Sequence, residues 1–434
     1  MPVPEKIFQL RDVFGINRDV PLNYVVRSNI DNVLLDQLTR DHHLVIHGSS
    51  KQGKTCLRKH CLEDDDYIVV TCLNKWGLSD LYGAILKQAG YEIQQSSKLT
   101  ISGRHKVEAK FTGETSVPLI AKAKGEGTYS FEKGGGEVVR VPLELDFEDP
   151  NDVIRAFNDI GFKKFIVLED FHYLPIDTQK NFSFALKAFH ENSKLCFIVV
   201  GVWREQDRLI AYNGDLTSRV VSIDADKWSA DQLGDVIEAG EALLNVQFDG
   251  AFRDDLVRSS YESVIIVQEA CYRLCELSGI YSTQHEHKVI GEGQSAAAIV
   301  KEVVDKQKAR YLGFLTNFAD GFQSTTLAMY RWILYPVLTA APIDLEEGIR
   351  LTDLSRIIKQ QHPQGAALNN GNLTQALQNA ASLQVQKEIR PIILDYDQTN
   401  HRLNVVDRGF LIWLGNQNTK EMLELVELPA VGLA

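Results

Sequence analysis

The chain has 434 residues, of which 44% are hydrophobic and 24% charged, and its formal net charge is −12. This length exceeds one ordinary core and predicts two or three domains, while the acidic balance argues against a broadly basic nucleic-acid surface. No apolar run approaches the roughly 20 residues that cross a bilayer, and the amino terminus lacks the layout of a signal peptide. Six scattered cysteines favour reduced thiols and a cytoplasmic protein.

The first predicted core element is a buried strand over 43–48, HLVIHG. The next residues match G-x-x-x-x-G-K-[ST] at every fixed position, and a helical segment follows. In this loop the glycines let backbone N–H groups cradle phosphates, Lys54 places its charge against the β- and γ-phosphates, and the Thr55 hydroxyl ligates Mg²⁺. We therefore expect ATP and Mg²⁺ to bind at Gly48, Ser49, Ser50, Lys51, Gln52, Gly53, Lys54, Thr55 and Cys56.

An apolar run over 67–73, YIVVTCL, predicts a second strand with a helix after it. From 91 to 150 apolar and polar residues alternate around the turn-rich stretch GEGTYSFEKGGGE, which predicts antiparallel strands inserted into the core. A nucleic-acid or acidic-partner contact is one interpretation of this insertion, but a solvated hairpin face is favoured. Its cations are Lys98, Arg104, Lys106, Lys110, Lys122, Lys124, Lys133 and Arg140.

The segment KFIVLEDFHYL predicts a strand that ends in Glu169 and Asp170. P-loop ATPases need acids at such a strand end, one for the metal and one for the attacking water. By register Glu169 takes the metal role and Asp170 the base role. The usual order is Asp-Glu, and the shorter Asp arm predicts slow hydrolysis. His172 and Tyr173 could contact a γ-phosphate, although packing beneath the sheet is the favoured interpretation.

Two further apolar runs, over 194–203 and 218–224, alternate with helical patterns and complete a predicted parallel sheet covered on both faces. This order of P-loop, acidic strand, further strand and NGDLTSRVVSIDADKWSADQL resembles the AAA+/STAND branch of P-loop ATPases. The resemblance implies an extra strand between the P-loop and acidic strands, and a helical lid. It also implies that Arg219 reads a γ-phosphate on a neighbouring subunit, with Arg204 and Arg208 as rivals, and that Tyr24 and Arg27 lie beside the adenine.

After the lid, three helical segments and a hairpin resemble a winged-helix domain. Its third helix, from about 370 to 386, contains no Lys or Arg, so protein contact is favoured over DNA reading. The expected fold is α/β: a P-loop NTPase sheet with inserted β-hairpins, a helical lid and a C-terminal winged-helix domain. The expected parts are an N-terminal segment (1–22), the core (23–225) with its insertion (91–150), the lid (226–290), a connecting helix (291–326), a winged-helix-like domain (327–420) and a tail (421–434).

The sequence shows no second catalytic constellation, which favours an ATP-binding, slowly hydrolysing molecular switch that controls homo-oligomeric assembly. STAND proteins of prokaryotes join such a core to effector and sensor parts. Their absence from this sequence implies a companion effector, by analogy in anti-phage defence or signalling. Three alternatives stay open: an initiator- or transposition-type ATPase that binds DNA, a P-loop kinase, and a scaffold that holds ATP without hydrolysing it. A membrane partner is not expected.

Overall fold

The core of the protein is a five-stranded parallel sheet. A computed structural model describes residues 6–17, 19–93, 105–112, 138–226 and 228–430. All neighbouring strands of the sheet run parallel. In spatial order they are β2 (Tyr67–Thr71), β6 (Phe165–Glu169), β7 (Phe197–Val200), β1 (His43–His47) and β8 (Val220–Asp224). β7 thus separates the P-loop strand from the acidic strand, and the predicted fold class is confirmed.

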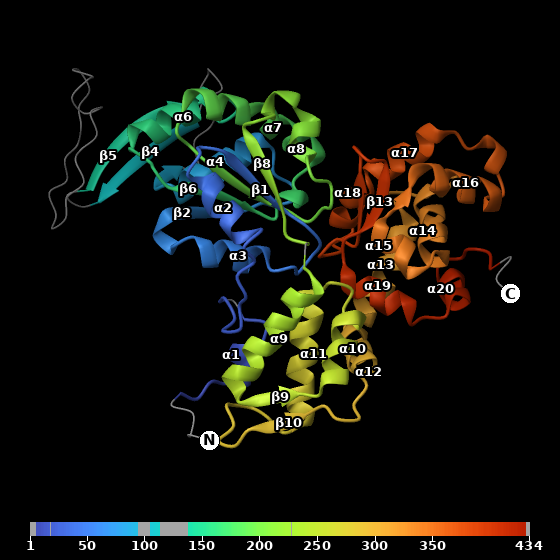
Figure 1. Cartoon of the computed structure of the whole chain (residues 1–434). Coiled ribbons are helices and arrows are strands. Elements are labelled where there is room, and N and C mark those ends of the chain that lie inside the picture. Colours follow the sequence, from blue (N-terminus) through green and yellow to red (C-terminus); the bar gives the residue numbers. More distant parts are fainter. Residues whose placement is uncertain (1–5, 18, 94–104, 113–137, 227, 431–434) are drawn as a thin grey trace, which may run out of the picture.

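Helices cover both faces of this sheet (Figure 1). Successive side chains of a strand point to opposite faces. Leu44 and Ile46 of β1 therefore share one apolar cluster with Leu34 and Leu57, whereas Val45 belongs to the cluster on the other face. The first face carries α2 (Asp31–Leu38) and α3 (Lys54–Cys61), and the second carries α4 (Leu78–Gln88), α6 (Pro150–Asp159) and α7 (Ile176–Asn192). A short helix, α8 (Arg208–Tyr212), contacts α7.

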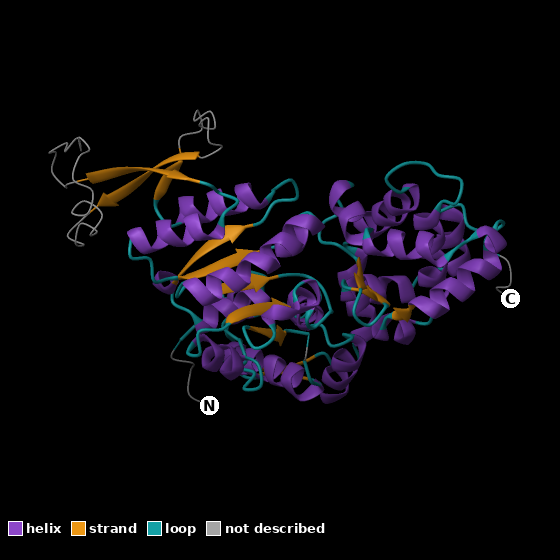
Figure 2. Cartoon of the chain, turned by 90° about the horizontal axis from the view of Figure 1, so that it is seen from above, coloured by secondary structure: helices purple, strands orange, loops and turns teal. Residues whose placement is uncertain are grey.

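The insertion is an antiparallel sheet of β3 (Tyr91–Ile93), β4 (His105–Thr112) and β5 (Val138–Leu145). It projects from the core on the side away from the C-terminal domain (Figures 1 and 2). Three of its predicted cations lie on described strands, and Lys110 pairs in register with Arg140. The other cations, and the turn-rich stretch, lie outside the described residues; the cations are Lys98, Arg104, Lys122, Lys124 and Lys133.

The lid is a helical bundle that also packs the N-terminal helix α1 (Leu10–Val13). Its elements are α9 (Ala230–Leu244), β9 (Val246–Phe248), α10 (Gly250–Ser259), α11 (Val264–Leu277), β10 (Lys288–Ile290) and α12 (Ala296–Asp305). The single connecting helix expected over 291–326 is two helices, α12 and α13 (Lys308–Asp320). The chain turns between them because α12 packs on α10 and α11, whereas α13 packs on α14 (Met329–Thr339) of the C-terminal domain.

The C-terminal domain has the element order of a winged helix, with a three-stranded sheet in the order β11-β13-β12. The third helix is split at Asn379, and the closing segment is a hairpin followed by a helix, because the Asp407 carboxylate caps α19. Most of α20 (Thr419–Leu425) lies in the expected tail, and this helix packs on α14. The remaining elements are α15 (Pro342–Glu347), β11 (Ile349–Arg350), α16 (Leu351–Gln361), α17 (Asn370–Gln378), α18 (Ala380–Gln386), β12 (Leu394–Asp397), β13 (Arg402–Val405), α19 (Arg408–Gly415) and α20 (Thr419–Leu425).

All six cysteines are free thiols. Within the described part of the chain, no helix combines the length and apolar character that a membrane span requires.

Candidate nucleotide-binding site

The predicted P-loop lies between β1 and α3, at the carboxyl edge of the sheet, where it turns through two glycines. Gly48 has φ 137° and Gly53 has φ 81°, values that L side chains rarely adopt. A Cβ on Gly48 would also approach the backbone nitrogen of Asp226 to 3.1 Å. Gly53 is the N-cap residue of α3, so the helix begins at Lys54 with its free N–H groups toward the loop. The local geometry is therefore that of a phosphate-binding loop.

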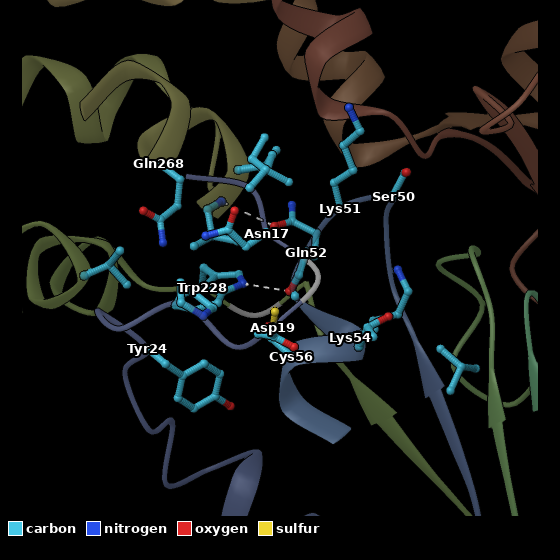
Figure 3. A pocket seen from close by; sticks show the side chains of 18 of the residues that line it. Asn17, Asp19, Tyr24, Ser50, Lys51, Gln52, Lys54, Cys56, Trp228 and Gln268 are labelled. Atoms are coloured by element: carbon cyan, nitrogen blue, oxygen red, sulfur yellow. Dashed lines mark hydrogen bonds between the residues drawn. The ribbon is translucent and has the colours of Figure 1, made fainter. Parts of the chain in front are cut away.

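A cavity of about 400 Å³ adjoins this loop and joins a polar end to an apolar end. Figure 3 shows Lys54 on one side of the cavity and Trp228 with Gln268 on the other, with Gln52 between them. The polar end is lined by Ser50, Lys51, Gln52, Gly53, Lys54, Thr55, Cys56, Glu169, Asp170 and His172. The apolar end is lined chiefly by Val25, Trp228, Val236, Val264 and Ile265, with Asn23 and Gln268. Phosphates suit the first end and a flat base suits the second.

The Lys54 ammonium lies back against its own loop. Its Nζ donates to the carbonyl oxygens of Gly48 at 3.0 Å and Ser49 at 2.5 Å. Burial lowers the pKa of Lys54 to about 8. Phosphate oxygens entering the cavity would replace weak carbonyl partners with anionic ones, which is a favourable exchange for a buried cation.

All three parts of the protein hold the P-loop. The Asp226 carboxylate, just after β8, accepts hydrogen bonds from the N–H and Oγ of Ser49, both at 2.7 Å. Gln52 links the loop to the lid through two hydrogen bonds of 3.4 Å. Its Nε2 donates to the Glu262 carbonyl oxygen, and its Oε1 accepts from the Val264 N–H. The Ser50 N–H donates to the carbonyl oxygen of Val406, in the C-terminal domain, at 2.8 Å. Movement of the lid or the C-terminal domain therefore acts directly on the loop.

Glu169 and Asp170 both reach the cavity at the end of β6. Burial raises the pKa of each carboxyl, and the positive charge of Lys54 opposes that rise. Thr55 supplies a hydroxyl at the same end of the cavity. A hydroxyl and carboxylates are the oxygen ligands that Mg²⁺ accepts beside nucleotide phosphates, so the residues present fit this ion. Thr55 and the acids at this strand end would hold the ion, which would supply positive charge to neutralise the phosphates.

His172 contacts both the acidic segment and the strand end at β7. Its Nδ1 accepts the Val202 N–H at 3.3 Å, so the ring proton belongs on Nε2, which has no partner among the described residues. Burial holds the pKa of His172 well below its usual range and keeps the ring neutral.

Tyr24 and Arg27 both line the cavity, as the resemblance implies, yet each is already engaged. The Tyr24 hydroxyl donates to Asp31 at 2.6 Å, and its ring stacks on His60. The Arg27 guanidinium lies 4.0 Å from the ring centroid of Trp228, and its NH1 donates to the Ala225 carbonyl oxygen at 3.0 Å. Arg27 therefore braces Trp228 at the apolar end.

The candidate arginines lie apart from this cavity. Arg219 precedes β8, at the amino edge of the sheet, opposite its own P-loop, and pairs with Glu191 at 2.8 Å. Arg208 is buried and pairs with Asp395, while Arg204 donates to the Glu346 carbonyl oxygen. These two rivals thus attach the core to the C-terminal domain.

Several lining or supporting residues were not expected from the sequence: Arg58, Asp226, Trp228, Val236, Val264, Ile265 and Gln268. The lid residues among them follow an ordinary helical pattern, so a core helix and a cavity wall have the same appearance in sequence. Trp228, which lies between the end of β8 at Asp224 and the start of α9 at Ala230, offered one local signal, a large aromatic residue at the start of the lid.

No protein-family model matches the chain, and no curated protein matches it in sequence. Among solved structures it is similar to a Walker-type ATPase of Pyrococcus abyssi, with 12% identity over 93% of this chain and 99% of that one and a TM-score of 0.46. It is also similar to Cdc6p from Pyrobaculum aerophilum, with 12% identity over 96% and 98% and a TM-score of 0.41. The Aeropyrum pernix Orc1 protein, solved in complex with DNA, shows 9% identity over 96% and 97% and a TM-score of 0.43. These low values transfer no residue roles to this chain.

Proposed function

We propose that this protein is an ATP-binding molecular switch whose nucleotide site controls the position of the C-terminal domain. The observation that carries the proposal is the bond from the Ser50 N–H to the Val406 carbonyl oxygen. Backbone N–H groups of this loop are the donors that phosphate oxygens use. The docked C-terminal domain occupies one of them, so binding of a triphosphate and docking of the domain compete for the same group.

The docked position is held by contacts beyond that bond. The Glu205 carboxylate accepts from the N–H of Thr399 at 3.1 Å and from its hydroxyl at 2.6 Å. The Arg208–Asp395 ion pair is buried beside them. Val202 packs in an apolar cluster with Val406 of the docked domain. A ligand that favours the undocked state must overcome these contacts, which makes the arrangement a two-state element.

The test uses linkage between docking and binding. Thr399→Val keeps the side-chain shape but removes the hydroxyl bond to Glu205, which should weaken docking of the C-terminal domain by roughly 1 kcal/mol. Because docking competes with nucleotide binding, we expect the variant to bind a non-hydrolysable ATP analogue about fivefold more tightly. The control is Thr326→Val, an exposed threonine in the loop that leads into α14. Small-angle scattering should show a larger radius of gyration when the analogue is bound. Unchanged affinity and unchanged radius together would refute the switch.

We extend the proposal to assembly and to slow, Mg²⁺-dependent hydrolysis. Arg219 lies at the edge of the sheet opposite its own P-loop, so only the nucleotide of a neighbouring subunit suits it. By analogy with STAND proteins, we include a companion effector protein in prokaryotic anti-phage defence or signalling. Copurification of a protein encoded by a neighbouring gene would test this companion. A non-hydrolysing scaffold predicts the same ATP binding with no phosphate release.

A DNA-binding initiator-type ATPase is the second candidate. The winged-helix order of the C-terminal domain and the projecting insertion, in which Lys110 and Arg140 are register partners on β4 and β5, support it. The third helix, α17 with α18, contains no Lys or Arg and offers little gain from counterion release. Duplex DNA that stimulates phosphate release, with binding that weakens steeply as salt rises, would favour this candidate over the switch.

A further inference from the structure

The two acids at the end of β6 differ in their partners. The Glu169 Oε1 lies 3.1 Å from the Nε of Arg58, and the two side chains are only 16% and 5% exposed. The Asp170 carboxylate, in contrast, receives no hydrogen bond from the described part of the chain. Asp170 lines the nucleotide cavity, where the nearby charges of Lys54 and Arg390 oppose the rise in its pKa that burial causes. One acid is thus neutralised by a fixed cation and the other is available.

The fold makes Arg58 dependent on Glu169. Arg58 lies one turn after Lys54 on α3, so it is directed at the same sheet edge. Its guanidinium lies 4.6 Å from the ring centroid of Tyr67, on β2 next to β6, and its NH1 has no partner in the described structure. A buried guanidinium needs an anion, and Glu169 provides it. The pair therefore braces α3 against β2 and β6.

The backbone explains why Asp170 behaves differently. It adopts φ 58°, the left-handed region that Asp tolerates better than most residues. This turn ends the alternation of β6, so Asp170 does not continue the strand register that Glu169 obeys. Consecutive acids are thereby placed in different environments.

We propose that Asp170 is the carboxylate that would hold the magnesium ion of the bound nucleotide. Glu169 is instead a positioning residue that Arg58 holds in place. The proposal rests on the proposed nucleotide binding and reverses the roles that strand register suggested. Magnesium in nucleotide sites takes one or two carboxylates together with phosphates and water, and Asp170 with Thr55 meets that need. With Asp170 committed to the metal and Glu169 paired with Arg58, neither acid of this strand end is free to polarise the attacking water, which agrees with the slow turnover proposed above.

The test measures how much Mg²⁺ strengthens binding of a fluorescent ATP analogue, with EDTA as the metal-free state, in the full chain. Asp170→Asn preserves the shape of the side chain. In this variant Mg²⁺ should strengthen binding of the analogue at least tenfold less than in the wild type, while the affinity measured in EDTA should stay the same. Glu169→Gln should keep the tightening within about twofold but lower the melting temperature. Because loss of either partner leaves the other unpaired, Arg58→Met combined with Glu169→Gln should recover part of that loss.

Two results would overturn the assignment: loss of the Mg²⁺ effect in Glu169→Gln with retention in Asp170→Asn, or equal loss in both. Either result leaves ATP binding by the wild-type chain intact, so the proposed function would survive. If the wild-type chain bound no nucleotide at all, with or without Mg²⁺, the proposed function and this assignment would both fall.

Discussion

Asp226 accepts two hydrogen bonds of 2.7 Å from Ser49, one from the backbone N–H and one from the hydroxyl, and thereby ties the P-loop to the loop after β8. Asp226→Ala should leave both buried donors without a partner. Since hydrogen bonds to charged groups are the stronger ones, we expect a loss of about 2–3 kcal/mol in the free energy of unfolding, measured by chemical denaturation. Nucleotide affinity should fall as well, because the loop loses its fixed position.

The matched control is Asp226→Asn, which can accept the Ser49 N–H and donate to the Ser49 hydroxyl. It should lose less than half as much stability as the alanine variant. Equal losses in the two variants would show that the charge, and not the pair of hydrogen bonds, holds the loop.

Lys54→Met should reduce ATP affinity at least 100-fold, about 3 kcal/mol, because the variant loses the buried ammonium that lies against the phosphate loop. The protein should stay folded, since the substitution removes a buried charge whose hydrogen bonds in the described structure go to carbonyl groups. Titration with a fluorescent ATP analogue measures the effect, with Lys87→Met, an exposed lysine on α4, as the control. Undiminished affinity in the Lys54 variant would remove the site assignment.

His43 should make stability depend on pH below neutrality. Burial, with the charge of His190 as a lesser cause, lowers the pKa of His43 from 6.5 to about 3. Between pH 6.5 and 3 the unfolded chain binds a proton that the folded protein does not, so this stabilisation is complete above 6.5 and is lost as pH falls. The contribution approaches about 1.4 kcal/mol per pH unit.

The measurement is the difference in unfolding free energy between the wild-type protein and His43→Gln across that range. The difference should shrink toward acid pH, while the exposed His285→Gln should follow the wild type. A constant difference would mean that His43 is not buried as the neutral ring.

Arg219→Ala should bind ATP with unchanged affinity, because Arg219 lies at the opposite edge of the sheet from its own P-loop. If Arg219 reads the nucleotide of a neighbour, the variant should fail to assemble with a non-hydrolysable ATP analogue, which native mass measurement detects. Arg40→Ala, which removes an exposed arginine paired with Asp36 on the surface, is the control. Normal assembly of the Arg219 variant would exclude this contact and leave Arg219 as a partner of Glu191.

The sheet was predictable because its five strands are short apolar runs that only a covered sheet can bury. The P-loop was predictable because its fixed glycine positions, which the sequence shows directly, are those where the backbone needs a positive φ. The prediction of a single helix over 291–326 was wrong, because helical periodicity does not indicate which neighbour a segment packs on. The helix α19 was missed because its apolar run, FLIWL, suits a strand as well as a buried helix.

The acids illustrate the same limit within the site. Strand register assigned the metal role to Glu169 and the base role to Asp170, and only the folded chain shows that Arg58 pairs with Glu169. The apolar end of the cavity was equally invisible, since Val236 and Gln268 come from separate lid helices that meet only after folding.

The sequence alone determined that this protein has a phosphate loop on a parallel sheet, because that chemistry depends on neighbouring residues at fixed spacing. Tertiary structure decided which groups are free to act. Val406 covers the Ser50 amide and Arg58 neutralises Glu169 through contacts between residues far apart in the chain, and local patterns carry no record of such contacts.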